Sequence, residues 1–469
     1  MIERATSLTA LAGALLLAGC VNFIPDYERP AAPVPAAYPA ELMPVSATTG
    51  AVAAADIDWP AYFADARLRR LIEISLANNR DLRVAILNIE QARAAYQIRR
   101  ADELPTVNLG AAAQRQPAAG GLVNSFAVGF QITGYELDLF GRVRSLSQAA
   151  LSQYLATEEA RKAAQIALVA AVANAYVNVL ADEELLRVTR DTLQAREESF
   201  KLTRLRFENG ASSQLDAAQA AQLLEGARAA LAQAQRQRAL DDNTLQLLLG
   251  QAPPADLPPG VPLGSQQKVV DLPAGLPSEL LTRRPDVRAA EQLLLAANAN
   301  IGAARAAFFP RISLTASAGT ASNELGNLFQ SGTFAFTGVA TLLQPIFDAG
   351  RNQANLDLAR VNRDIAVAQY EKAIQTAFRE VADALAGRAT LGEQLRAQAA
   401  LVDAAQVSFN LTDLRYRNGA SSYFEVLEAQ RALFTAQLAV VQVQAQQVQN
   451  LVTLYKVLGG GWKETSGGP

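Results

Sequence analysis

The sequence LTRLRFENGASS (residues 202–213) returns as LTDLRYRNGASS (residues 411–422), with nine of twelve positions identical at an offset of 209 residues. Shorter matches at the same or a slightly smaller offset are Gly141-Arg142 with Gly350-Arg351, Asp81 with Asp286, Arg83 with Arg288, and Pro105 with Pro310. The two halves therefore share an order of elements. Such a chain is a tandem duplication of one unit, and repeated units usually need further copies to bury their apolar faces.

The repeated stretch lies at the end of two long helical segments. Residues 142–207 contain no Gly or Pro, and residues 352–416 contain no Pro and two Gly. Either segment would form a helix of roughly 100 Å, and the shorter segments 65–102 and 211–249 would each form about 57 Å. Two short helices laid end to end match one long helix. Each half is therefore expected to be a hairpin in which a long helix runs beside two short ones, with Gly210 or Gly419 at the turn and Ser212 or Ser213 capping the next helix.

Between these helices the hydrophobic period changes from the helical one to strict alternation. Val107, Leu109, Ala111 and Ala113 alternate with small or polar residues, and a turn-rich stretch separates them from a second alternating run. This pattern predicts β-hairpins with one apolar and one polar face. The expected strands are about 104–116 and 124–138 in the first half, and about 310–321 and 333–346 in the second.

A hairpin with these two faces fits either a half-buried sheet in water or the wall of a membrane barrel. Four strands cannot close a barrel, and open strand edges are not tolerated in lipid. Two copies would supply eight strands around a filled interior, whereas three would supply twelve around a lumen. If the hairpins enter a membrane, the chain must oligomerise. The alternative is a soluble coiled-coil scaffold.

Composition excludes several classes of function. The 469 residues carry a net charge of −3 without a basic block, which argues against nucleic acid as a partner. The chain has no histidine, so His-based triads and His metal sites are excluded, and one cysteine excludes an internal disulfide framework. No cofactor or metal is expected, and no catalytic residue.

The N-terminus reads as a secretory signal. An apolar run from Leu8 to Ala18 precedes Leu17-Ala18-Gly19-Cys20, so cleavage would leave Cys20 first, where a lipid can be attached. The alternative is a plain signal peptide with an incidental cysteine. No later stretch is expected to form a transmembrane helix. The expected organisation is a signal peptide (1–19), a lipidated extended segment (20–64), a first repeat (65–250), a linker (251–277), a second repeat (278–462) and a tail (463–469).

Five stretches together resemble a known family. They are Cys20-Val-Asn-Phe-Ile-Pro-Asp-Tyr-Glu-Arg-Pro, Trp59-Pro-Ala-Tyr-Phe-Ala-Asp, Arg283-Arg-Pro-Asp-Val-Arg-Ala-Ala-Glu, Ala307-Phe-Phe-Pro-Arg-Ile and Leu454-Tyr-Lys-Val-Leu-Gly-Gly-Gly-Trp462. This set resembles the outer-membrane factor (TolC) family, most closely the OprM type (NodT-like), over the whole chain to about Trp462.

The resemblance implies a mainly α protein with a transmembrane β-barrel contribution. As a homotrimer it would form a twelve-stranded barrel in the bacterial outer membrane and a twelve-helix tunnel in the periplasm, with a lipid anchor on Cys20. It would be the exit duct of a tripartite multidrug efflux pump, passively conducting drugs and other small molecules. The implied partners are a periplasmic adaptor protein, an inner-membrane transporter of the RND class and outer-membrane lipid.

The resemblance also assigns residues at the periplasmic tip. The turns that the adaptor would grip are Asn209, Gly210, Ala211, Ser212, Asn418, Gly419, Ala420 and Ser421. The gate that would close the tip consists of Tyr416, Phe424, Glu425, Glu428, Arg431 and Asp216. At one position of the second turn, where the family has an arginine, this chain has Ser421. Arg415 and Arg417 are the candidates to take over the role of that arginine.

Helical spacing supports part of this assignment. Phe424, Glu428 and Arg431 are four and three residues apart and so share one helix face. Three symmetry-related copies would place them in a ring, where ion pairs between chains could hold the tip closed. The alternative is a solvated helix face with an incidental ion pair.

Three other functions are compatible with parts of the sequence. Glu425 and Glu428 could be an acid–base pair of an enzyme, but no nucleophile, phosphate loop or metal cluster accompanies them. The fold could serve a type I protein-secretion duct. The chain could also be a lipid-anchored periplasmic coiled-coil protein.

Overall fold

The computed structural model describes residues 22–39, 54–118, 121–266 and 283–462. The predicted signal peptide, Cys20 and the tail after Trp462 lie outside the described residues. The chain divides into two compact units. Unit 1 takes in Met1–Ala31, Leu87–Glu159 and Arg288–Lys372, and unit 2 takes in Ala32–Ile86, Ala160–Val287 and Ala373–Pro469.

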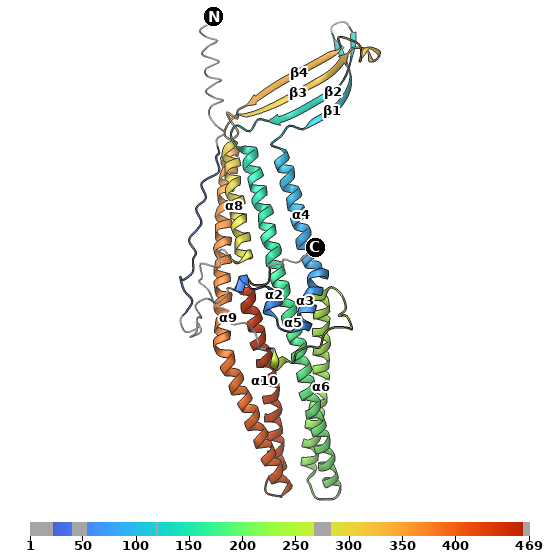
Figure 1. The fold of residues 1–469 in the computed structure, drawn as a ribbon, viewed down its shortest axis with the longest axis vertical. Coiled ribbons are helices and arrows are strands. Elements are labelled where there is room, and N and C mark those ends of the chain that lie inside the picture. The colour runs from blue at the N-terminus through green and yellow to red at the C-terminus, as the bar shows by residue number, and fades with distance from the viewer. Residues whose placement is uncertain (1–21, 40–53, 119–120, 267–282, 463–469) are drawn as a thin grey trace. The chain divides into compact units, whose positions relative to one another are not determined.

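The two long helices are confirmed. They are α5 (Arg142–Glu208) and α9 (Arg351–Arg417), each of 67 residues, and they are followed by α6 (Gln214–Leu249) and α10 (Tyr423–Val457) (Figure 1). The remaining elements in chain order are η2 (Ala54–Asp56), α2 (Trp59–Tyr62), α3 (Ala66–Asn78), α4 (Arg80–Ala101), η3 (Leu263–Ser265), α8 (Pro285–Ala306) and η5 (Leu325–Asn327).

The expectation of one uninterrupted helix over 65–102 is wrong, because Asn79 breaks it into α3 and α4. Asn79 has an extended backbone conformation. Its side-chain oxygen accepts the Leu82 N–H at 2.9 Å and caps α4, and its side-chain nitrogen donates to the Leu248 carbonyl at 3.0 Å. The Ser75 hydroxyl donates to the same carbonyl at 2.7 Å. These bonds hold the end of α6 against the end of α3, as the end-to-end arrangement requires.

The helix α5 differs from expectation in one respect. It contains an 18-residue stretch whose length and composition would allow it to cross a membrane, although no such helix was expected. Of that stretch, 67 % is buried within the described structure. In unit 2, α5 buries Val169, Val172 and Tyr176. Its apolar residues are therefore used for packing.

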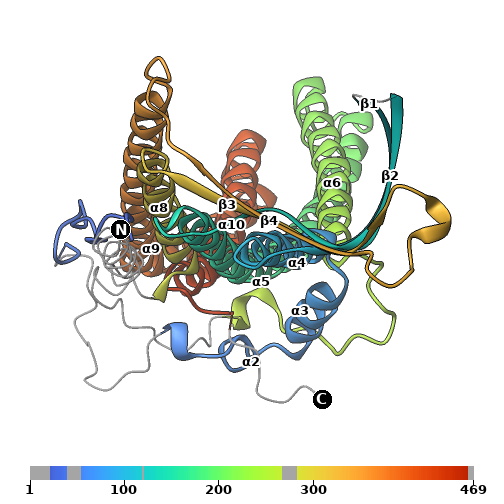
Figure 2. The ribbon, with the colours of Figure 1, turned by 90° about the horizontal axis from the view of Figure 1, so that it is seen from above.

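Unit 1 contains one antiparallel sheet of four strands, β1 (Val107–Ala118), β2 (Gly121–Glu136), β3 (Arg311–Ser322) and β4 (Phe334–Leu343). They lie side by side in chain order (Figure 1), and Figure 2 shows β2 curving along its length. Within the described residues, β1 and β4 each pair on one side only. The sheet therefore has two edges whose outward backbone groups are unpaired.

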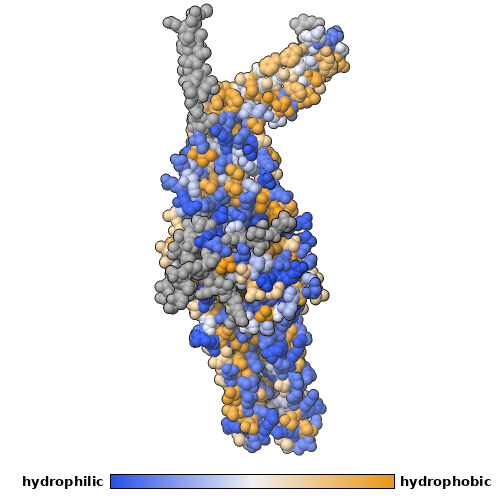
Figure 3. Space-filling view, in the orientation of Figure 1, coloured by the Kyte–Doolittle hydropathy of each residue, from blue (hydrophilic) through white to orange (hydrophobic). Residues whose placement is uncertain are grey.

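Strand register sorts the side chains onto two faces. Leu109 pairs with Phe130, Phe130 with Ala318, and Ala318 with Phe336, so these residues share one face. The next row is polar, from Asn108 through Gln131 and Ser317 to Thr337. The apolar residues are open to the surroundings, with Leu109 71 % and Phe336 68 % exposed. Figure 3 shows hydrophobic residues over much of the visible face of the sheet.

The sheet joins the helices of unit 1 through a buried carboxylate. Glu136, the last residue of β2, accepts two hydrogen bonds of 2.7 Å from Arg142 at the start of α5. Arg311, the first residue of β3, lies 2.6 Å from the same carboxylate. The Glu136 side chain is only 10 % exposed. One acid therefore ties three elements together at the base of the sheet.

Replacing Glu136 with glutamine should weaken this junction by about 2 kcal/mol, because two guanidinium groups lose their buried counter-charge. Hydrogen–deuterium exchange of the β2 and β3 amides near the junction should then be about 30-fold faster. Arg311→Gln is the control, since the Arg311 side chain is 58 % exposed and its loss leaves the Glu136–Arg142 pair intact. Equal protection in Glu136→Gln and the unchanged protein would contradict this role.

Candidate functional site

The candidate site lies in unit 2, where the α5–α6 and α9–α10 turns carry the repeated sequence. The two turns are built alike. Gly210 and Gly419 have φ values of 72° and 74°, in the left-handed region that favours glycine. Ala211 N–H donates to the Arg206 carbonyl at 2.8 Å, and Ala420 N–H donates to that of Arg415 at 2.8 Å. The predicted docking residues therefore form two copies of one exposed surface feature.

The asparagines of the two turns explain part of the repeated sequence. The side chain of Asn209 donates to the Leu205 carbonyl at 2.7 Å, and that of Asn418 donates to the Leu414 carbonyl at 2.7 Å. Each of these carbonyls also accepts the backbone N–H of the same asparagine, at 3.1 Å for Leu205 and 3.2 Å for Leu414. The side chain therefore adds a second hydrogen bond at the end of its long helix. Both asparagines and both glycines are exposed.

Two of the predicted gate acids cap helices. Asp216 and Ser213 form a reciprocal capping box at the start of α6, and Glu425 and Ser422 form the matching box at the start of α10. Burial raises the pKa of Asp216, but hydrogen bonds from Ser213 outweigh this and leave it lowered. Hydrogen bonds from Ser421 and Ser422 likewise lower the pKa of Glu425. Both carboxylates therefore stay charged and engaged within their own chain.

Ser421, which stands where the resemblance implies an arginine, bonds on or beside its own turn, as do the two nearby arginines. The Ser421 hydroxyl donates to Glu425 at 2.7 Å. Arg415 donates to the Ala420 carbonyl at 3.2 Å, and Arg417 pairs with Asp413 at 2.8 Å. Both arginines thus bond to residues on or beside their own turn, and Ser421 extends the α10 cap.

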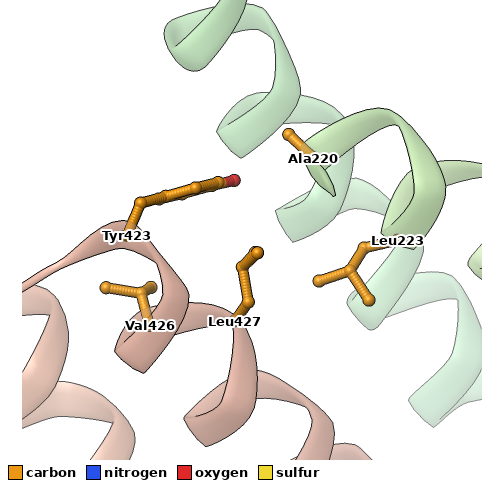
Figure 4. Close-up of a cluster of buried hydrophobic side chains, with 5 residues drawn as sticks. All are labelled: Ala220, Leu223, Tyr423, Val426 and Leu427. Carbon is orange, nitrogen blue, oxygen red and sulfur yellow. The ribbon is translucent and has the colours of Figure 1, made fainter. Parts of the chain in front are cut away.

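A buried cluster that the sequence did not predict joins the two hairpins. Figure 4 shows Tyr423, Val426 and Leu427 of α10 facing Ala220 and Leu223 of α6. Tyr423 is 5 % exposed, and its hydroxyl lies 3.0 Å from that of Ser199 on α5. The spacing of Tyr423, Val426 and Leu427 is that of one helix face, which could have indicated the cluster.

The predicted gate residue Tyr416 packs at the edge of this cluster. Its ring centroid lies 5.3 Å from that of Tyr423, and the Arg206 guanidinium lies 5.3 Å over the Tyr416 ring. Arg206 belongs to α5 and Tyr416 to α9. Tyr416 therefore contacts both hairpins, through a ring contact on one side and a cation–π contact on the other.

A second arginine of α5 bridges the hairpins further from the turns. Arg196 is 7 % exposed, donates to the Leu223 carbonyl at 3.1 Å and lies 5.1 Å from the Phe434 ring centroid. Burial, and then the nearby charge of Arg431, lower the pKa of Arg196. The sequence did not single out Arg196, because an arginine in a charged helix gives no sign of burial.

Three other predicted gate residues lie on an exposed face of α10, beside the buried one. Phe424 is 56 % exposed. Arg431 donates to Glu428 at 2.7 Å, with both side chains nearly half exposed. This pair lies within one helix and contributes roughly 0.2–1 kcal/mol at such exposure. The structure thus separates the six predicted gate residues into an exposed group (Phe424, Glu428 and Arg431), two capping acids (Asp216 and Glu425) and the packed Tyr416.

Among the described residues, no group of three or more Cys, Asp or Glu side chains could hold a metal ion. The arrangement at the turns instead provides exposed polar surface, capped helix ends and an apolar contact between two hairpins.

Comparison with known proteins identifies related chains. Residues 71–251 and 276–460 match the family described as outer membrane efflux protein. The chain is 48 % identical to the probable efflux pump outer membrane protein TtgC of Pseudomonas putida, with 98 % of this chain and 97 % of TtgC covered. It is 47 % identical to the outer membrane protein OprJ of Pseudomonas aeruginosa, with 99 % and 98 % covered.

The fold also resembles solved structures. The open state of the MtrE outer membrane channel of Neisseria gonorrhoeae aligns with a TM-score of 0.86 and 42 % sequence identity, covering 94 % of this chain and 99 % of that one.

Proposed function

The chain belongs to the outer membrane efflux protein family, and we propose that it works as a homotrimer, forming the exit channel of a tripartite efflux pump. Its location is the outer membrane, and its role is that of the pump's outer-membrane component. The family is one of channels rather than enzymes. The cargo class follows the relatives, which are named for the efflux of antibiotics, toluene and solvents.

The single observation that carries the trimer is the unfinished sheet. Its four strands have one apolar face, one polar face and two unpaired edges, at β1 and β4. Lipid does not tolerate unpaired backbone groups, each of which costs several kcal/mol. Pairing β4 of one copy with β1 of the next removes every edge, and three copies supply twelve strands around a polar lumen.

The helices supply the rest of the proposed conduit. The helix α5 begins six residues after β2 and runs without interruption to the first turn. Three copies of α5 with α3, α4 and α6, and of α9 with α8 and α10, would form the periplasmic tunnel. An inner-membrane RND transporter would feed it through a periplasmic adaptor.

The lipid on Cys20 remains a proposal. The first residues of the mature chain pack on unit 1, since the Asn298 side chain donates to the Pro25 carbonyl at 2.7 Å and Arg305 donates to that of Phe23 at 3.2 Å. These bonds hold the segment that follows Cys20 close to the sheet-bearing unit. Mass spectrometry of the N-terminal peptide should show acylation, and an unmodified Cys20 would refute it.

The proposed gate combines the packed and the exposed residues of the turns. Tyr416→Ala removes a contact between hairpins, and Glu428→Ala removes an acid from the exposed α10 face. The double variant should therefore raise single-channel conductance in planar bilayers. Glu393→Ala is the matched control, because Glu393 forms a similar exposed pair with Arg396 three residues away, on α9. Conductance equal to that of the unchanged channel would remove the gate assignment.

The proposed docking surface consists of the two turns. Ala211 and Ala420 are exposed, and their substitution does not disturb the left-handed glycines beside them. Ala211→Trp together with Ala420→Trp should abolish crosslinking to the adaptor while leaving the oligomer intact. Leu240→Trp on the exposed side of α6 is the control. Persistent crosslinking in the double variant would exclude the turns as the docking site.

A further inference from the structure

A polar cavity of about 520 Å³ lies in unit 1 beside the base of the sheet. Its walls come from the end of α4, the start of α5 and the segment after Cys20. The side chains that carry charge or polarity are Asn22, Tyr96, Arg100, Glu103, Arg144 and Gln148. Its volume falls within the range of pockets that hold small molecules.

The charged side chains of this cavity are incompletely paired. Within the described ranges, the side chains of Arg100 and Glu103 make no hydrogen bond or ion pair. Arg144 donates to the Asp138 carbonyl at 3.2 Å, while its Nε lies 3.6 Å from the Asp138 carboxylate. Two guanidinium groups with donors to spare and one free carboxylate therefore share a single hollow.

Two features place the cavity where a lipid headgroup would lie. Glu103 is followed directly by Leu104, which is 70 % exposed, and then by β1 with its exposed Val107 and Leu109. Asn22 stands two residues after Cys20, the proposed point of lipid attachment. The cavity thus lies beside the exposed apolar residues that begin with Leu104, and its lining includes Asn22, which is close in sequence to the proposed anchor.

We propose that this cavity binds the headgroup of an ethanolamine phospholipid from the membrane around the channel. Arg100 and Arg144 donate to the phosphodiester, and Glu103 accepts from the ammonium group. Guanidinium groups bind phosphate oxygens through charge-assisted hydrogen bonds. A carboxylate opposite them selects a headgroup that carries an amine over one that carries only hydroxyls. The acyl chains extend along the exposed leucines that begin with Leu104. This inference rests on the proposed function, since it requires the sheet to lie in a membrane.

The test uses the full-length protein in nanodiscs of equal parts phosphatidylethanolamine and phosphatidylglycerol, with a trace of either lipid carrying a photoreactive acyl chain. Labelled peptides are identified by mass spectrometry. The ethanolamine lipid should label the peptides around Tyr96–Leu104 and Arg144–Leu151 more strongly than the glycerol lipid. Arg100→Gln with Arg144→Gln should reduce labelling by both lipids about tenfold or more, as expected for lost charge-assisted bonds.

Two further variants distinguish specific recognition of the ethanolamine headgroup from general electrostatic attraction of lipid phosphates. Glu103→Gln should retain labelling but lose the preference for ethanolamine. Arg99→Gln should leave labelling unchanged, because Arg99 pairs with Asp102 and lies outside the cavity wall. Equal labelling by both lipids in the unchanged protein, or a preference that survives Glu103→Gln, overturns the proposal.

Soluble competitors distinguish a lipid from a free anion. Glycerophosphoethanolamine should reduce labelling more than inorganic phosphate at equal concentration. If phosphate competes equally well, the cavity is a general anion site and the lipid assignment is wrong. Single-channel conductance of the same samples keeps the two proposals apart: conductance without selective labelling overturns only the headgroup site, and absence of conductance overturns the channel.

Discussion

Replacing Arg284 with methionine should destabilise the start of α8 by roughly 3 kcal/mol, at the lower end of the range for breaking a buried ion pair. Arg284 is 7 % exposed. It lies 2.6 Å from Asp286 and 2.8 Å from Glu380 on α9, and it donates to the Val457 carbonyl at 3.3 Å. The value is at the lower end because Asp286 and Glu380 remain partly exposed to water.

Hydrogen–deuterium exchange at the first turns of α8 is the appropriate measurement, because a large membrane protein does not unfold in a single reversible step. Exchange should become about 100-fold faster in Arg284→Met. The adjacent Arg283→Met is the control. Arg283 forms a more exposed pair with Asp56 at 3.1 Å, so its loss should cost less than about 1 kcal/mol. Similar exchange in the two variants would contradict the role given to Arg284.

Replacing Tyr423 with alanine should remove about 3–5 kcal/mol of packing between the α5–α6 and α9–α10 hairpins. The ring is buried against Leu223, Val426 and Leu427, and it contacts Tyr416. Its removal leaves a cavity at the contact that holds the two turns together. Single-channel conductance should rise, and amide exchange at the starts of α6 and α10 should accelerate.

Phe424, the next residue, provides a matched control for Tyr423. Phe424 is 56 % exposed, so Phe424→Ala should change local exchange little. If Phe424 narrows the pore, conductance rises in that variant without loss of packing. Tyr423→Phe keeps the ring and removes only the hydroxyl. It should lower the stability of the contact by about 0.5–1.5 kcal/mol, because the hydrogen bond to Ser199 is lost. Unchanged conductance and exchange in Tyr423→Ala would refute the cluster's role.

The repeated sequence and the change of hydrophobic period predicted the long helices and the four strands. The long helices follow from stretches with almost no Gly or Pro, and the two-faced sheet follows from alternation at Leu109, Phe130 and Phe336. The break at Asn79 escaped prediction, because asparagine between helical stretches stops a helix only when its side chain finds partners. Here those partners are Leu82 and Leu248, and Leu248 is distant in sequence.

The five motifs indicated the family, but they did not indicate the structural role of their residues. Asp65 of the Trp59 motif caps α3 and accepts from Tyr176 at 3.1 Å, Val261 at 3.1 Å and Gln266 at 2.6 Å. Tyr62 of the same motif stacks on Tyr455 of the C-terminal motif, with ring centroids 3.9 Å apart. The two motifs therefore stabilise unit 2. The sequence could not show this, because the contacts join residues that are far apart along the chain.

The candidate site was predicted in part. Spacing placed Phe424, Glu428 and Arg431 on one face, and the structure puts all three on the exposed face of α10. Spacing did not reveal that Asp216 and Glu425 cap helices, although a serine three residues before each acid is the usual signature. Tyr423 was not predicted, because the resemblance assigns no role to it and its apolar partners Ala220 and Leu223 are distant in sequence.

The proposed channel requires that the four-stranded sheet of one chain is completed by other copies of the same chain. Native mass spectrometry of the full-length protein, extracted from outer membranes in mild detergent, measures this directly. The predicted result is a complex of three identical chains that conducts ions when reconstituted. A single chain or a pair that conducts equally well would contradict it.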